Sequence, residues 1–141
     1  MAVTFDRIHH GMLHPLHAFL LAGTVPLFLG ALLSDFAYSS TFEVQWHNFA
    51  SWLIAGALVF GGLALLGAVI DWRRTGHGGR YTLYCLLLLA TWGLGFINAL
   101  IHARDAWAMM PTGLVLSAIV LVLACMATWL GFSGFRPGGT P

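Results

Sequence analysis

Four long apolar stretches without a single charged residue most constrain what this chain can fold into. They cover residues 16–33, 49–70, 81–101 and 109–132, and none of them contains Asp, Glu, Lys or Arg. Stretches of about 18–24 residues, rising about 1.5 Å per residue in a helix, can cross the hydrocarbon core of a bilayer. A soluble helical bundle would instead need a charged face on each helix. The sequence therefore predicts an all-α, integral membrane four-helix bundle.

One domain is expected to fill nearly the whole chain. We predict a single four-helix transmembrane domain at residues 1–135, with helices at about 13–36, 48–71, 81–103 and 108–132, and a flexible tail at 136–141. The first stretch is interpreted as a retained helix rather than a signal peptide, because His17 and Pro26 interrupt it and Asp6 precedes it. Small residues four apart predict close contacts between helices: Ala57 with Gly61, Ala64 with Ala68, and Gly95 with Ala99.

The arginines predict the orientation in the membrane. With four crossings, both termini and the joint after the second helix lie on one side. That side carries five of the six basic residues, all arginines, whereas the other side carries only Arg104. By the positive-inside rule, both termini are expected in the cytoplasm. Charged residues make up only 8% and the formal net charge is +1, so nothing in the composition indicates a nucleic-acid partner.

Polar side chains near one membrane face form a predicted inner cluster. His14 and His17 are three residues apart and so share one face of the first helix, and Asp71 closes the second helix at the same depth. Asp71 could therefore hydrogen-bond either histidine, as a proton relay or as a structural polar pair. The competing interpretation is that such side chains are hydrated in the headgroup region or cap helix ends.

A predicted outer cluster lies at the opposite face. Asp35 closes the first helix, His47 opens the second, and Asn98 and His102 are stacked four residues apart near the end of the third. An imidazole backed by a carboxylate can exchange protons, bind a metal or hold a haem. His17 is roughly 25 Å from His102 in depth, so these two cannot hold one haem between them. A haem with two histidine ligands would need His47 with His102 on the outer side, or His14 or His17 with a partner on the inner side.

Each apolar stretch is also bordered by distinctive polar motifs. They are His14-Pro15-Leu16-His17 with Pro26 and Asp35, Trp46-His47-Asn48-Phe49-Ala50-Ser51-Trp52-Leu53-Ile54, the segment 67–71, Asn98 with His102-Ala103-Arg104-Asp105-Ala106-Trp107, Pro111-Thr112-Gly113-Leu114, and Trp129-Leu130-Gly131. From Leu13 to Phe132 the chain resembles a family of bacterial membrane proteins known as domain of unknown function 2231. Family members often have a small or amide residue where this chain has His47, and proline where it has Ala18. The resemblance implies four helices in the bacterial inner membrane and, through relatives linked to cytochromes and sugar dehydrogenases, redox work.

Three functions remain open, and no motif of a known enzyme class accompanies them. The first, which we favour, is a redox-accessory subunit for electron transfer with a quinone or a b-type haem. The second is a proton or metal conduit through the two clusters, with no particular metal indicated, and the third is a non-enzymatic anchor or scaffold for a periplasmic partner. The partners would be the lipid bilayer, a periplasmic redox protein and, if the chain oligomerises, further copies of it. The candidate cofactor-binding residues are His102, Asn98, Asp35, His47, His14 and His17.

Overall fold

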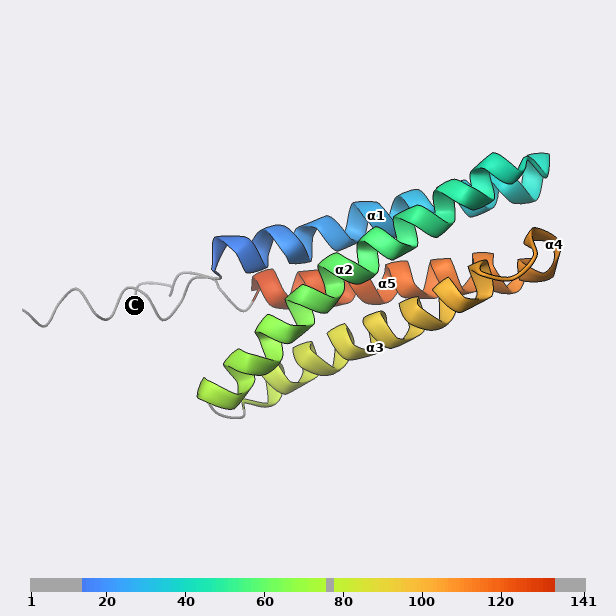
Figure 1. Cartoon of the computed structure of the whole chain (residues 1–141). Helices are drawn as coiled ribbons and strands as arrows, with labels where there is room; N and C mark the ends of the chain where they lie inside the picture. The colour runs from blue at the N-terminus through green and yellow to red at the C-terminus, as the bar shows by residue number, and fades with distance from the viewer. Residues whose placement is uncertain (1–13, 76–77, 134–141) are drawn as a thin grey trace, which may run out of the picture.

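The computed structural model describes residues 14–75 and 78–133, which fold into four long helices and one short one (Figure 1). The elements are α1 (Pro15–Thr41), α2 (Val44–Thr75), α3 (Gly79–His102), α4 (Ala106–Met109) and α5 (Thr112–Ser133). All except α4 are long and apolar enough to cross a membrane. The all-α membrane bundle expected from the sequence is therefore confirmed. The predicted tail lies outside the described residues.

The first helix is longer than the sequence indicated. We expected it to end near residue 36, but α1 continues to Thr41 and passes through Pro26 without interruption. It ends where Phe42 adopts a left-handed conformation (φ 56°) and its N–H donates to the Tyr38 carbonyl at 2.8 Å. Only two residues then separate α1 from α2. As a result, Asp35 lies inside a helix, more than a turn before its end, rather than closing it.

The fourth crossing also begins later than expected. The prediction placed a continuous helix from about residue 108, whereas the structure has the one-turn helix α4 and a separate α5 that begins at Thr112. Pro111 precedes α5 directly, and its carbonyl accepts the N–H of Val115 at 3.1 Å. Proline suits this place because the first residues of a helix have no intrahelical partner for their N–H groups. The break allows α4 to fold over the end of the bundle.

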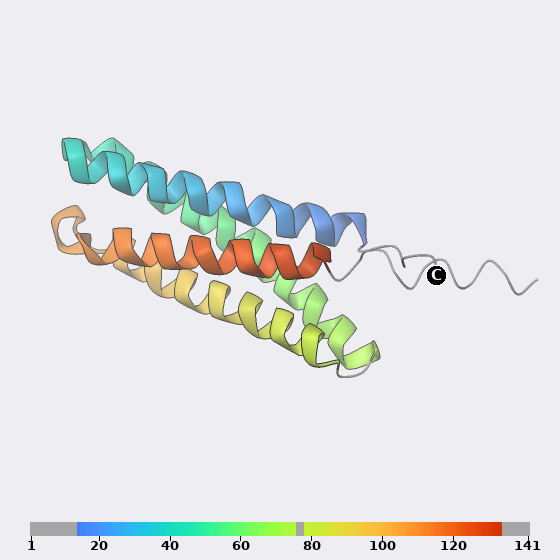
Figure 2. The same cartoon turned by 180° about the vertical axis from the view of Figure 1, so that it is seen from behind.

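The four long helices form a ring in which each one contacts two others. α1 packs against α2 and α5, and α3 packs against the same two helices from the other side. Figures 1 and 2 show from opposite sides that α1 and α2 run side by side at the α4 end, whereas the end of α2 and the start of α3 lie together and diverge from α1 and α5 at the other end.

The bundle is apolar outside, and many of its buried side chains are small or polar, as suits lipid surroundings. Side chains such as Phe19, Leu33 and Trp129 are exposed, and they cover the long helices over their whole length. The predicted contact residues Ala57, Gly61, Ala64, Ala68 and Gly95 are buried, and Ala99 is half-buried. Small residues let helix backbones approach closely in a membrane, where lipid competes equally well for large apolar side chains. The interior therefore has room for polar side chains that must be satisfied within the bundle.

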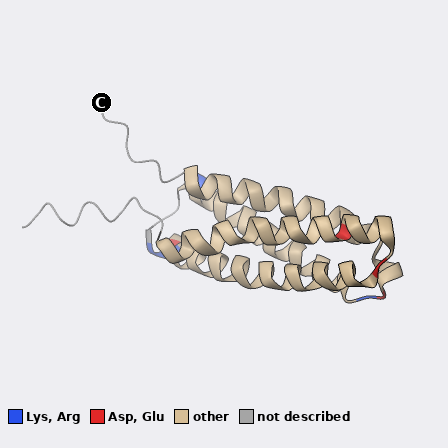
Figure 3. Cartoon of the chain, turned by 90° about the horizontal axis from the view of Figure 1, so that it is seen from above, with Lys and Arg blue, Asp and Glu red and all other residues tan. Residues whose placement is uncertain are grey.

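Charges gather at the two ends of the bundle, with one acidic exception (Figure 3). Arg73, Arg74 and Arg80 lie at the diverging end, and Arg104 lies at the α4 end. The exception is Asp35, which is fully buried inside α1. A carboxylate in this position needs a partner, because an isolated charge in a membrane interior is costly.

Candidate functional site

Asp35, Asn98, His102 and Ser117 form one buried cluster, which we call the Asp35 cluster. Asp35 comes from α1, Asn98 and His102 from α3, and Ser117 from α5. Each of these four residues is only 0–3% exposed to solvent. The structure thus brings together three of the predicted outer residues and adds Ser117, which the sequence analysis missed. One buried network therefore joins three of the four long helices.

Every member of the Asp35 cluster is hydrogen-bonded to another. The Nε2 atom of His102 lies 2.8 Å from Oδ1 of Asp35. Ser117 donates its hydroxyl to Oδ2 of Asp35 at 2.5 Å, and it accepts the side-chain N–H of Asn98 at 2.9 Å. The second ring nitrogen of His102, Nδ1, lies 2.9 Å from the backbone carbonyl of Asn98. The carboxylate is therefore held from two sides.

These contacts determine where the protons are. A backbone carbonyl can only accept, so Nδ1 of His102 must carry a hydrogen. The Ser117 hydrogen is committed to Oδ2 of Asp35, because the Ser117 oxygen receives the Asn98 amide. A single transferable proton therefore lies between Nε2 of His102 and Oδ1 of Asp35. The pair holds it either as imidazolium and carboxylate or as neutral imidazole and carboxylic acid, and both forms are neutral overall.

One hydrogen-bond acceptor in the cluster has no donor among the described residues. The side-chain oxygen Oδ1 of Asn98 is buried and has no hydrogen-bond partner among the described residues. Buried polar atoms are usually paired, so an orphaned acceptor at a polar site marks a place for a donor such as water.

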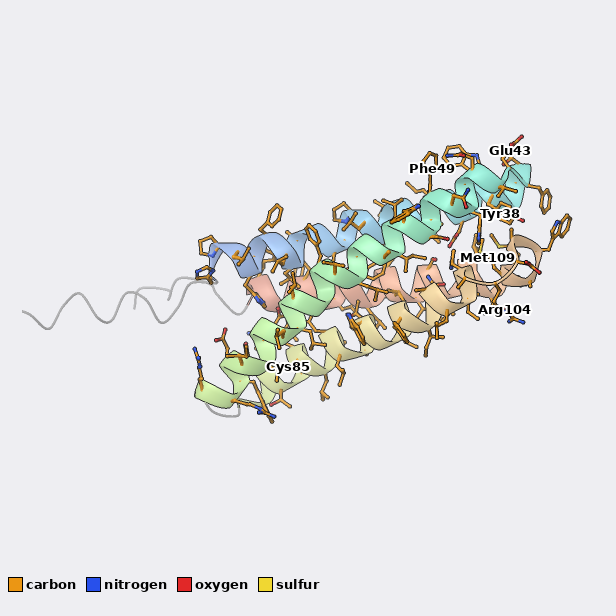
Figure 4. All side chains as sticks on the ribbon, in the orientation of Figure 1. Tyr38, Glu43, Phe49, Cys85, Arg104 and Met109 are labelled. Atoms are coloured by element: carbon orange, nitrogen blue, oxygen red, sulfur yellow. The ribbon has the colours of Figure 1, made fainter. Side chains whose placement is uncertain are left out.

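His47 and Met109 cover the Asp35 cluster at the α4 end. Nδ1 of His47 lies 3.1 Å from the sulfur of Met109, and its ring stacks on that of His102 with centroids 5.7 Å apart and an interplanar angle of 6°. Tyr38 packs against His47 from α1 with ring centroids 6.0 Å apart, and Figure 4 shows Tyr38 and Met109 at the same end of the bundle. His47 is 8% exposed, more than any member of the cluster. It is therefore the titratable group between the cluster and the exterior.

Gly113 makes this close packing feasible. A β-carbon placed there would lie 3.0 Å from Cε1 of His102 and 3.3 Å from the sulfur of Met109. Only glycine therefore lets the start of α5 approach the buried imidazole and thioether so closely without displacing them.

The predicted pair of haem ligands does not have the arrangement that iron needs. Two axial imidazoles point a nitrogen each at the metal from opposite sides. The rings of His47 and His102 are instead stacked face to face, and both nitrogens of His102 are engaged by Asp35 and Asn98. Within residues 14–75 and 78–133, no group of three or more His, Cys, Asp and Glu side chains is placed to hold a metal ion.

A quinone headgroup fits the Asp35 cluster poorly as well. A quinone needs hydrogen-bond donors directed at its carbonyl oxygens and a surface against which to pack. The donors of Ser117 and His102 point to other members of the cluster, and Asp35 and Asn98 have no exposed surface. The geometry therefore fits neither cofactor, and it is suited to holding a proton.

The predicted inner cluster is less compact. His14 is exposed and caps α1, its Nδ1 accepting the Leu16 N–H at 3.3 Å. His17 instead lies 2.7 Å from the hydroxyl of Tyr84 on α3, a partner that the sequence analysis missed. Asp71 is exposed, and its pairing with either histidine stays a prediction. His17 and Tyr84 link α1 with α3 at the diverging end.

An apolar layer separates the two polar regions. Phe28, Ala57, Val120 and Ala124 form a buried apolar cluster, and Val120 follows Ser117 by three residues, or about one turn along α5. The hydroxyl of Thr91, deeper in the bundle, is bonded to the Leu87 carbonyl of its own helix. The described polar side chains therefore form no continuous path for a proton from one face to the other.

The fold and the cluster define a class: a multi-pass helical membrane protein with one ionisable network sealed among its helices. Within that class, the chain belongs to the family described as predicted membrane proteins, DUF2231, whose profile matches residues 13–134. The family resemblance expected from the sequence is thereby confirmed. No curated protein and no solved structure matches the chain.

Proposed function

We propose that this protein is a proton-responsive membrane protein that exchanges a proton at the Asp35–His102 pair. The single observation that carries the proposal is the 2.8 Å contact between Nε2 of His102 and Oδ1 of Asp35 inside a sealed network. Imidazole and carboxyl groups in contact can share, gain or lose a proton within the physiological range of pH. Intramembrane ionisable residues commonly serve proton transfer.

Proton exchange changes how the helices are held. With one proton between the two side chains, the pair is neutral and its hydrogen bonds are complete. Loss of that proton leaves an uncompensated carboxylate, and gain of a second removes an acceptor from Ser117 or His102. Because Asp35, His102 and Ser117 belong to α1, α3 and α5, either change alters the packing of these three helices at the α4 end.

The proton enters and leaves from the α4 end. The apolar layer of Phe28 and Val120 lies on the other side of the cluster, whereas His47 lies between the cluster and the exterior. Met109 contacts His47 there, and Gly113 at the start of α5 lies against His102. With the predicted orientation in the bacterial inner membrane, this end faces the periplasm, and the protein acts as a sensor or coupling subunit rather than as an enzyme.

Infrared difference spectroscopy tests the proposal directly. The full-length protein in mild detergent would be compared at acidic and alkaline pH, with its aspartates labelled with ¹³C. The chain has only five acidic residues, so a single buried carboxyl group can be resolved. We expect a carboxylic acid band that Asp35→Asn abolishes and that Asp105→Asn, a change at an exposed residue on the α4 loop, leaves in place. Identical spectra for the wild type and Asp35→Asn would refute the proposal.

The other predicted functions give different results with the same preparation. An electron-transfer subunit would carry a visible haem spectrum or a co-purifying quinone that His102→Ala removes. Against this outcome, both ring nitrogens of His102 are already engaged by Asn98 and Asp35. A scaffold would retain its periplasmic partner in Asp35→Asn and show no proton-dependent change. We place both below proton exchange because no specific contact among the described residues favours them.

A further inference from the structure

A surface hollow lies beside α5, near the end of the bundle opposite α4. Its volume is about 490 Å³. It lies on the surface of α5, a helix that is long and apolar enough to cross a membrane, so the hollow faces lipid. One lining residue comes from α1 and five from α5: Val25, Cys125, Thr128, Trp129, Phe132 and Ser133. Trp129 is 77% exposed, and such a ring commonly settles at headgroup level. The hollow therefore extends from the headgroup region into the hydrocarbon core.

A guanidinium group lies at the mouth of this hollow. Arg80, on α3, donates from Nη2 to the hydroxyl of Ser133 at 2.8 Å, and Ser133 lines the hollow. This bond uses one of the five guanidinium donors, and Arg80 is exposed. A phosphate group can accept two parallel hydrogen bonds from such a fork. Arg80 can therefore bind a phosphate beside Ser133 without leaving its present position.

A second polar group lies deeper in the hollow. The hydroxyl of Thr128 is buried and has no hydrogen-bond partner among the described residues. The comparable hydroxyl of Thr91 is satisfied by the carbonyl of Leu87, four residues earlier in its helix. Thr128 precedes Ser133 by five residues, or about 7.5 Å along the helix. That spacing is of the order of the distance between the phosphate and the ester carbonyls of a glycerophospholipid.

We infer that this hollow binds one anionic glycerophospholipid. Its phosphate lies on Arg80 and Ser133, an ester carbonyl accepts from Thr128 after rotation of that side chain, and one acyl chain lies against Trp129 and Phe132. An anionic lipid is favoured because Arg73 and Arg74 add positive charge at the same end of the bundle. The inference is independent of the proton site at the other end.

Native mass spectrometry of the full-length protein in a neutral detergent tests this inference. Phosphatidylglycerol and phosphatidylcholine with identical acyl chains would be titrated separately. We expect one phosphatidylglycerol bound with about tenfold higher affinity, the factor that a charge-assisted contact readily supplies. Equal affinities for the two lipids would overturn the inference. Displacement of the lipid by inorganic phosphate alone would also overturn it, because the site would then bind a phosphate and not a lipid.

Matched variants assign the preference to Arg80. Arg80→Gln should lower the affinity for phosphatidylglycerol to that for phosphatidylcholine, whereas Arg73→Gln, at the same end but on α2, should preserve most of the difference. Equal losses in both variants would show a general surface charge and refute the site. If Arg80→Gln fails to assemble, quenching of tryptophan fluorescence by phosphatidylglycerol with brominated chains replaces it. That quenching should fall markedly in Trp129→Leu, and an unchanged quenching would refute the position of the acyl chain.

Discussion

Replacing Asp35 with alanine removes the acceptor of two buried hydrogen bonds at once. The imidazole of His102 and the hydroxyl of Ser117 would both lose their partner, at a site where Asp35 is completely buried. Removing one member of a buried charged pair typically costs about 3–5 kcal/mol. For a chain of this size, such a loss lowers the melting temperature by roughly 6–20 °C.

Thermal unfolding in mild detergent measures this effect, and Asp105→Ala is the matched control. Asp105 is exposed at the start of α4, and its side chain makes no capping hydrogen bond. Its replacement should change stability by less than about 0.5 kcal/mol. Equal, small effects of Asp35→Ala and Asp105→Ala would show that the buried network contributes little and would refute the reasoning.

The double variant Asp35→Ala, His102→Ala separates the pair from its surroundings. Once both partners are absent, no buried imidazole remains unpaired. The combined loss should therefore be clearly smaller than the sum of the two single losses, with a coupling of about 1–3 kcal/mol. Additive losses would mean that the two side chains stabilise the bundle independently.

Three further predictions use other contacts. Gly113→Ala should destabilise the protein by about 1–3 kcal/mol, because its methyl group would press on the histidine of the Asp35 cluster. The control is Gly93→Ala, because an added β-carbon there has no neighbouring atom within 4 Å, and it should leave stability unchanged or raise it by up to about 1 kcal/mol. A lower melting temperature for Gly93→Ala than for Gly113→Ala would contradict the packing. Tyr84→Phe should cost about 1 kcal/mol, since His17 loses its 2.7 Å partner, and an unaltered melting temperature would contradict that bond. A reporter active only in the cytoplasm should function when fused after Pro141, whereas activity of a periplasm-specific reporter there would reverse the predicted orientation.

The membrane bundle could be predicted from the sequence because it depends on length and charge, which a linear chain displays directly. The grouping of Asp35, Asn98 and His102 could also be anticipated. Two of them are four residues apart on one helix, and the third lies at a similar depth on another. Depth follows from counting residues along a helix. It requires no knowledge of how the helices are rotated against one another.

The sequence does not show how each helix is rotated about its own axis, and the residues that the sequence analysis missed depend on that rotation. Ser117 and Tyr84 lie in runs that are apolar all round, so no periodicity marks which side faces the interior. Met109 was placed in a continuous helix, although the chain breaks at Pro111 and folds the methionine back over His47. The end of α1 was placed too early because Asp35 was interpreted as a boundary. In the structure, a buried partner allows a charged residue to lie inside the helix.

The helix α5 connects the two sites that are proposed at opposite ends of the bundle. Its polar contacts to other helices lie near its two ends, through Ser117 with Asp35 and Asn98 and through Ser133 with Arg80. Between them, its buried positions carry small or β-branched side chains, which let the neighbouring helix backbones approach closely. In the two proposals, a change in the protonation of Asp35 acts on the first contact, and an anionic lipid binds beside the second. The two proposed sites are therefore carried by one helix, and each polar contact can be removed by its own substitution without changing the other.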